Sequence, residues 1–114
     1  MRIGELARLT GTTPRALRYY EEQGLLRPGR RQSGYRDYPP QAEHTVRHIQ
    51  LLLSAGLGTA TIAEILPCVP DGATVLAPKC PELLDGLARE RARITETMAG
   101  LAAARNVLDR IIGA

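Results

Sequence analysis

The chain has 114 residues, of which 44% are hydrophobic and 24% are charged. This length fits one domain with a short extension and leaves no room for a second, catalytic domain. The composition excludes a disordered tail, and no apolar run is long enough to cross a membrane. Because a helical pattern begins at the first residues and leaves no room for a signal peptide, we expect a cytoplasmic protein.

Positive charge is concentrated in the first part of the sequence. The net charge is +3, yet residues 1–48 hold nine arginines and five acidic residues, whereas residues 49–114 hold six basic and seven acidic residues. The planar guanidinium of arginine fits phosphate and guanine. The N-terminal part is therefore the expected contact for a polyanion such as DNA, although exposed arginines are also ordinary solvated surface.

Two short helices joined by a glycine turn are predicted over residues 3–9 and 14–22. Gly11 can adopt the left-handed conformation that turns the chain after the first helix. Thr13 is a natural N-cap for the second helix, and Pro14 suits its first position. This arrangement is typical of a helix-turn-helix.

The second helix is predicted to have an inner and an outer face. Ala16, Leu17 and Tyr20 fall together, and we expect them to pack against Leu6 and Leu9. The opposite face has the residue types that a recognition helix needs in a major groove, but a solvated charged face would look the same. The residues of this outer face are Arg15, Arg18, Tyr19 and Glu22.

A short two-stranded hairpin is predicted over residues 25–38, with a tip rich in Gly and Ser. Alternation places Tyr35 and Asp37 on one side of the return strand, and Arg36 and Tyr38 on the other. Such a hairpin is only marginally stable alone, so it must pack against the helices. Because it follows a helix-turn-helix, the hairpin would act as a wing that contacts DNA phosphates through its arginines. These are Arg30, Arg31 and Arg36.

Two further helices are predicted at about residues 40–55 and 59–66. Thr59 is expected to cap the second of these helices, and Pro67 to end it. Residues 67–80 are rich in proline and contain both cysteines, so we interpret them as a linker.

The last predicted helix, over residues 81–114, has apolar residues at alternating spacings of three and four. This is a heptad seam interrupted by Arg91 and Arg105, which would need carboxylate partners such as Glu90, Glu96 or Asp109. A dimerisation helix is favoured over a helix folded back on its own core. The apolar seam residues are Leu84, Leu87, Ile94, Met98, Leu101, Leu108 and Ile112.

The sequence resembles the MerR family of bacterial regulators. The match rests on Ile3-Gly4-Glu5-Leu6-Ala7, on Thr13 to Glu21, on Gly24 to Pro28, on Gly34-Tyr35-Arg36-Asp37-Tyr38 and on Ala55 to Leu66. The resemblance implies a mostly α-helical fold, in which a winged helix-turn-helix domain with a small β-hairpin (residues 1–66) and the linker (67–80) precede a long helix (81–114). That helix would form an antiparallel coiled coil in a homodimer.

The resemblance also implies a mechanism. Family dimers occupy promoters in which the −35 and −10 elements are too far apart for RNA polymerase. Effector binding makes the dimer kink and untwist the DNA between them, which realigns the two elements for the polymerase. Arg15, Arg18 and Tyr19 would contact base edges and phosphates, with Thr13 in the same interface. The expected backbone contacts are Tyr20, Arg30, Arg31, Tyr35 and Arg36, although Tyr20 also lies on the inner face and could be a core residue.

The effector is not evident from the sequence. Cysteines in a cytoplasmic chain are expected to be reduced, so no structural disulfide is predicted. Cys80 begins the last helix beside Lys79, and both features lower a thiol pKa. Cys68 and Cys80 could form a redox switch. They could also form a metal site with few ligands from one chain, which the partner chain of the dimer would complete. They could also be small apolar residues under the loop.

His44 and His48 stand four residues apart on a predicted helix, a spacing that can chelate a metal. No carboxylate or cysteine lies nearby in sequence, so we expect surface or phosphate-adjacent histidines. No cofactor is firmly predicted.

We therefore predict a DNA-binding transcription regulator that binds promoter DNA as a homodimer. The alternatives are an architectural, excisionase-like DNA-bending protein and a thiol- or metal-binding protein. An enzyme is not expected, because no nucleotide-binding glycine motif or metal-hydrolase signature is present.

Overall fold

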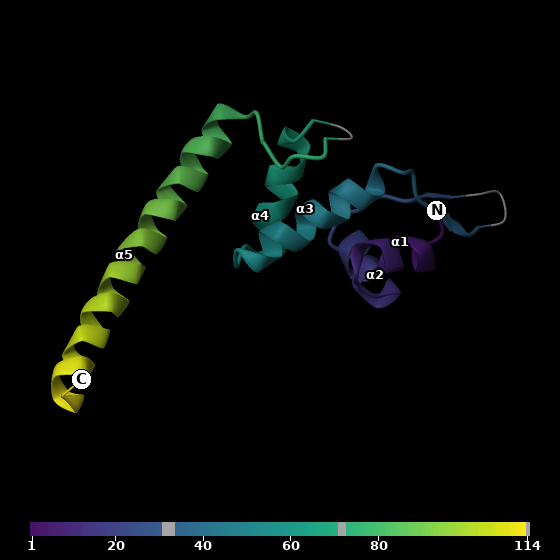
Figure 1. Ribbon diagram of the computed structural model, residues 1–114. Helices are drawn as coiled ribbons and strands as arrows, with labels where there is room; N and C mark the ends of the chain where they lie inside the picture. The colour runs from purple at the N-terminus through teal and green to yellow at the C-terminus, as the bar shows by residue number, and fades with distance from the viewer. Residues whose placement is uncertain (31–33, 71–72, 114) are drawn as a thin grey trace. The chain divides into compact units, whose positions relative to one another are not determined.

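A computed structural model describes residues 1–30, 34–70 and 73–113 of the chain (Figure 1). It divides into two compact units, Met1–Lys79 and Cys80–Ala114. The elements of the first unit are α1 (Ile3–Thr10), α2 (Pro14–Glu22), β1 (Gly29–Arg30), β2 (Arg36–Asp37), α3 (Ala42–Ser54), α4 (Thr59–Ile65) and the 3₁₀ turn η1 (Leu66–Cys68). The second unit consists of α5 (Pro81–Ile112).

The predicted helix-turn-helix is confirmed in α1 and α2. Gly11 ends α1 at φ 67°, and its N–H donates to the carbonyls of Ala7 and Arg8. Thr13 caps α2, because its Oγ1 accepts a hydrogen bond from the N–H of Ala16 at 3.1 Å. Pro14 occupies the first turn of α2. Local sequence signals thus fix both ends of the turn.

The core of the first unit lies where α1, α2, α3 and α4 meet. Its fully buried apolar side chains include Leu6, Leu17, Val46, Ile49, Ile62 and Ile65. Leu9 was predicted to join them, and this prediction is wrong, because 41% of its surface is exposed. Leu6 and Thr10, one turn apart on α1, are buried, so the inward stripe of this helix passes beside Leu9.

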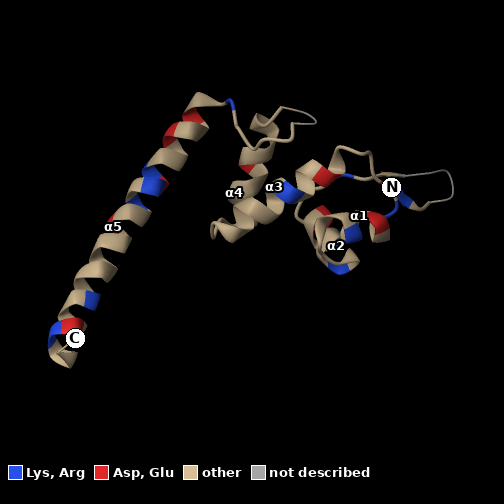
Figure 2. Ribbon diagram, in the orientation of Figure 1, with Lys and Arg blue, Asp and Glu red and all other residues tan. Residues whose placement is uncertain are grey.

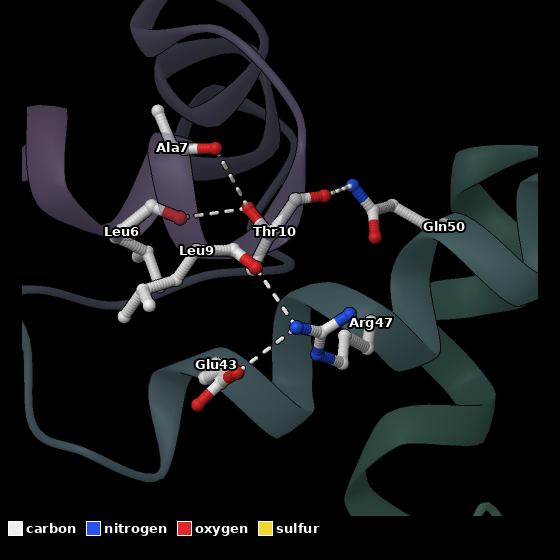
Figure 3. A network of polar contacts seen from close by, with 7 residues as sticks. All are labelled: Leu6, Ala7, Leu9, Thr10, Glu43, Arg47 and Gln50. Carbon is white, nitrogen blue, oxygen red and sulfur yellow. Dashed lines mark hydrogen bonds and ion pairs between the residues drawn. The ribbon is translucent and has the colours of Figure 1, made fainter.

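Polar contacts fix the end of α1 on α3 (Figure 3). Arg47 Nη2 donates to the carbonyl of Leu9 at 2.8 Å and to Glu43 Oε1 at 3.0 Å. Gln50 Nε2 donates to the carbonyl of Thr10 at 2.9 Å. These carbonyls belong to the last turn of α1, where no partner exists within the helix. Side chains of α3 therefore cap α1 and hold the helix-turn-helix in place.

The third and fourth helices are confirmed, with one correction at the beginning of α4. Thr59 was predicted to be the N-cap, but Gly58 takes that position and Thr59 is the first helical residue. The Thr59 hydroxyl donates instead to Gln23 Oε1 at 3.1 Å. Pro67 was predicted to end the helix, and α4 does end at Ile65, after which the chain continues as the separate 3₁₀ turn η1. Proline has no N–H donor and its ring clashes with the preceding helical turn, so it stops an α-helix but fits the first turn of η1.

The second unit confirms the predicted long helix, since α5 runs for 32 residues and carries no buried residue. Its apolar seam residues are exposed apart from Leu87, which is half-buried. Glu90 was one of the carboxylates expected to pair with Arg91 or Arg105, but it forms an ion pair with Arg93. Both Arg91 and Arg105 are exposed. Within the described ranges, no helix combines the length and apolar character needed to span a membrane.

Candidate DNA-binding surface

The outer face of α2 is solvent-exposed, as its residue spacing predicted. Arg15 and Arg18 are exposed, and so is nearly half of Tyr19. Figure 2 shows this positive charge on α2, in the same unit as the basic residues of α1. The face therefore presents two guanidinium groups and a phenol at one helical turn of spacing, which suits contacts to base edges and phosphates.

Tyr20 lies in the core instead of on this face. Only 7% of its surface is exposed, and its ring packs edge-on against that of Tyr19 at 6.4 Å between centroids. The structure thus favours the alternative interpretation of Tyr20 as a core residue. A backbone contact by Tyr20 remains a prediction.

The wing is a short antiparallel pair in which Gly29 opposes Asp37 and Arg30 opposes Arg36. The backbone N–H of Tyr38 donates to the carbonyl of Met1 at 2.7 Å, which ties the return strand to the start of α1. Arg31, a predicted phosphate contact at the tip, lies outside the described residues.

Tyr35 stands out from the wing, with more than half of its surface exposed. The guanidinium carbon of Arg2 lies 4.9 Å from the centroid of its ring, which is cation–π geometry. The contact places a cation beside an exposed aromatic ring on the wing. Both groups are suited to contact a phosphate backbone.

Glu21 joins the wing to α2. Arg36 Nε donates to both carboxylate oxygens of Glu21, at 2.9 and 3.1 Å, and the Tyr38 hydroxyl donates to Glu21 Oε1. The hydrogen bond to Glu21, followed by its charge, raises the pKa of Arg36. Burial, followed by the hydrogen bond to Glu21, raises the pKa of Tyr38. The carboxylate of Glu21 thus contributes to both shifts.

Sequence reasoning missed this bridge, although two signals pointed to it. Alternation had placed Arg36 and Tyr38 on the same side of the return strand. Glu21 follows Leu17 by four residues and Tyr20 by one, so it borders the inner face of α2. Only the fold brings these two faces together.

Cys68 and Cys80, the only cysteines of the chain, are both disulfide-bonded, and neither is a free thiol. This corrects the expectation that they are reduced. Within the first unit, the N–H of Lys79 donates to the carbonyl of Cys68 at 2.9 Å. That backbone bond brings the residue before Cys80 next to Cys68, which sequence separation could not reveal.

One of the two histidines of α3 also departs from expectation. His48 is buried, with 6% of its surface exposed, and its Nε2 lies 3.3 Å from the carbonyl oxygen of Thr74. His44 is half-buried. The prediction of surface histidines is therefore wrong for His48, because the backbone at Thr74 lies against its ring.

Residues 1–67 match the family described as MerR HTH family regulatory protein. The transcriptional regulator AdhR of Bacillus subtilis (strain 168) is 36% identical over 98 residues, which cover 84% of this chain and 66% of that protein. The chain spans about half the length of the first curated relatives it matches.

Two solved structures share the fold. The regulator PbrR691 from Ralstonia metallidurans CH34, in complex with lead(II), aligns with a TM-score of 0.72 and 24% identity, covering 95% of this chain and 82% of that one. HiNmlR, a MerR family regulator lacking the sensor domain and bound to promoter DNA, aligns with a TM-score of 0.63 and 19% identity, covering 98% and 86%.

These likenesses confirm a winged helix-turn-helix followed by a long helix. The matched family is one of regulatory proteins, in agreement with the expectation that the chain is not an enzyme. With the matched segment covering the helix-turn-helix, the wing and α4, the chain belongs to the MerR HTH family of regulatory proteins.

Proposed function

We propose that the chain binds promoter DNA as a homodimer and regulates transcription by distorting the promoter spacer. The outer face of α2 would enter the major groove, with Arg15, Arg18 and Tyr19 reading base edges and phosphates and Thr13 at its edge. The wing would contact the backbone through Arg30, Arg31, Tyr35 and Arg36. The observation that carries this proposal is the exposed basic face of α2 together with a wing bonded to the same helix through Glu21.

Dimerisation is assigned to α5. A helix of 32 residues whose apolar seam residues are mostly exposed would leave a long hydrophobic stripe in water. Pairing the stripe with that of a second copy removes it from solvent, as in a coiled coil. The seam residues proposed for this contact are Leu84, Leu87, Ile94, Met98, Leu101, Leu108 and Ile112.

RNA polymerase at the distorted promoter is the proposed downstream partner. Contacts to phosphates would offset the cost of bending and untwisting the DNA, which is on the order of a few kcal/mol. The structure of the relative HiNmlR on promoter DNA supports the DNA-bound part of this proposal.

The signal is assigned to Cys68 and Cys80, which are oxidised in the structure. Going from two thiols to the disulfide releases two protons and two electrons, which an oxidant of the peroxide or disulfide class would accept. The pair would then change the state of the linker between the winged domain and α5. This assignment concerns only the signal, so DNA binding can hold without it.

The first test is binding of the full chain to its own upstream promoter region, measured by fluorescence anisotropy against a shuffled duplex. Arg18→Ala removes a proposed base contact and should weaken specific binding roughly ten- to a hundredfold. Arg110→Ala removes the same charge from α5 and should leave specific binding nearly unchanged. Equal losses in both variants would mean that α2 is not the reading element.

A further inference from the structure

His44 and His48 line the same small pocket in the first unit. A cavity of about 70 Å³ lies between α3 and the segment that follows α4. Gln41, His44, Thr45 and His48 repeat at helical spacing, so they lie on one face of α3. Together with Leu66, Val69, Pro70 and Ala73 they line the cavity.

The hydrogen bond of His48 fixes which of its nitrogens is available. A carbonyl oxygen only accepts, so the Nε2 that lies 3.3 Å from the carbonyl of Thr74 must carry the hydrogen. In the neutral ring this leaves Nδ1 as the nitrogen with a lone pair. A bond from one imidazole nitrogen to a backbone carbonyl is the contact that orients a metal-binding histidine.

The pocket is small. Its volume of about 70 Å³ has room for an ion and the waters that would complete its coordination. Within the part of the chain that the structure describes, no three His, Cys, Asp or Glu side chains gather as a metal centre. A site here would therefore have two imidazole ligands, with water completing the coordination.

We propose that His44 and His48 bind one divalent transition-metal ion in this cavity, of the borderline class formed by Zn²⁺, Ni²⁺ and Co²⁺. Imidazole nitrogen suits these ions, whereas Mg²⁺ and Ca²⁺ require oxygen ligands. With two protein ligands the ion exchanges readily, so the site responds to metal supply. A bound ion would hold the His48 ring in the orientation in which it contacts the carbonyl of Thr74.

The proposed ligands include neither a cysteine nor DNA. In the oxidised chain neither cysteine offers a thiolate. Metal binding can therefore be measured without DNA, and its failure leaves the proposed function untouched.

The test is isothermal titration of the oxidised full chain with Zn²⁺ and with Ni²⁺. One ion per chain is expected, and His44→Ala should lower the affinity at least about tenfold. Leu51→Ala, on an exposed position of the same helix, is the matched control and should bind as the wild type does. Binding that is unchanged in His44→Ala, or absent at millimolar metal, would overturn the proposal.

Because His48 is buried, its replacement could unfold the chain, so its role is better followed in the intact protein. Long-range ¹H–¹⁵N spectra of the imidazole rings should show a metal-induced shift at Nδ1 of His48 and at a ring nitrogen of His44. A shift at His44 alone, with the His48 ring unperturbed, would rule out the two-histidine site.

Discussion

Glu21 connects the two parts of the proposed DNA-binding surface. It belongs to α2, yet it accepts hydrogen bonds from Arg36 and Tyr38 of the wing segment. The bond to Arg36 is charge-assisted and uses both carboxylate oxygens, the stronger kind of protein hydrogen bond. Glu21 therefore sets the position of the wing relative to the exposed outer face of α2.

Neutralising this carboxylate should loosen the wing. Glu21→Gln keeps the size of the side chain but removes the charge, and we expect Tm to fall by roughly 4 to 8 °C. Affinity for the operator should also fall, because the wing would no longer be held beside α2. Thermal unfolding and fluorescence anisotropy measure the two effects.

Glu22→Gln is the matched control for Glu21→Gln. Glu22 is the next residue, it is exposed, and its replacement removes the same negative charge from α2. This variant should keep the wild-type Tm and bind DNA at least as well. Identical behaviour of the two variants would mean that overall charge, and not the bridge to the wing, governs binding.

At the scale of elements, α5 differs from the other helices. The helices α1 to α4 each bury residues in the first unit, whereas α5 buries none. Its second half has an uncharged stretch between Glu96 and Arg105, which contains Met98 and Leu101 of the apolar seam. In the proposed dimer, this stretch is where a partner helix would cover α5.

A charge in this stretch should therefore prevent dimerisation. Leu101→Asp is expected to convert a dimer into a monomer at micromolar concentration, because burying an unpaired carboxylate in a coiled coil is strongly unfavourable. Sedimentation velocity measures the change. Ala103→Asp carries the same charge and helix propensity cost at an exposed position outside the seam, and it should remain dimeric. A dimeric Leu101→Asp protein would show that α5 does not mediate association.

At the scale of the whole molecule, the redox state of Cys68 and Cys80 should control transcription. We expect reduced and oxidised protein to give different transcript levels in vitro from the upstream promoter, with similar DNA occupancy, because the signal would act on DNA shape. Cys80→Ser removes the disulfide and should show one transcript level under both conditions. A redox response that persists in Cys80→Ser would place the signal elsewhere.

Much of this protein follows from local sequence. Gly11, Thr13 and Pro14 specify the turn between α1 and α2, since each acts through its own backbone or through the next helical turn. The exposed face of α2 and the seam of α5 follow from helical periodicity, which depends only on spacing.

The tertiary structure decided the contacts between residues distant in sequence. Four sets of contacts join segments that no local pattern links. They are the bridge from Glu21 to Arg36, the caps that Arg47 and Gln50 place on α1, the contact of buried His48 with Thr74, and the approach of Lys79 to Cys68. The exposure of Leu9 was decided in the same way. Helical spacing gives a residue's face, but only packing decides which neighbouring element covers it.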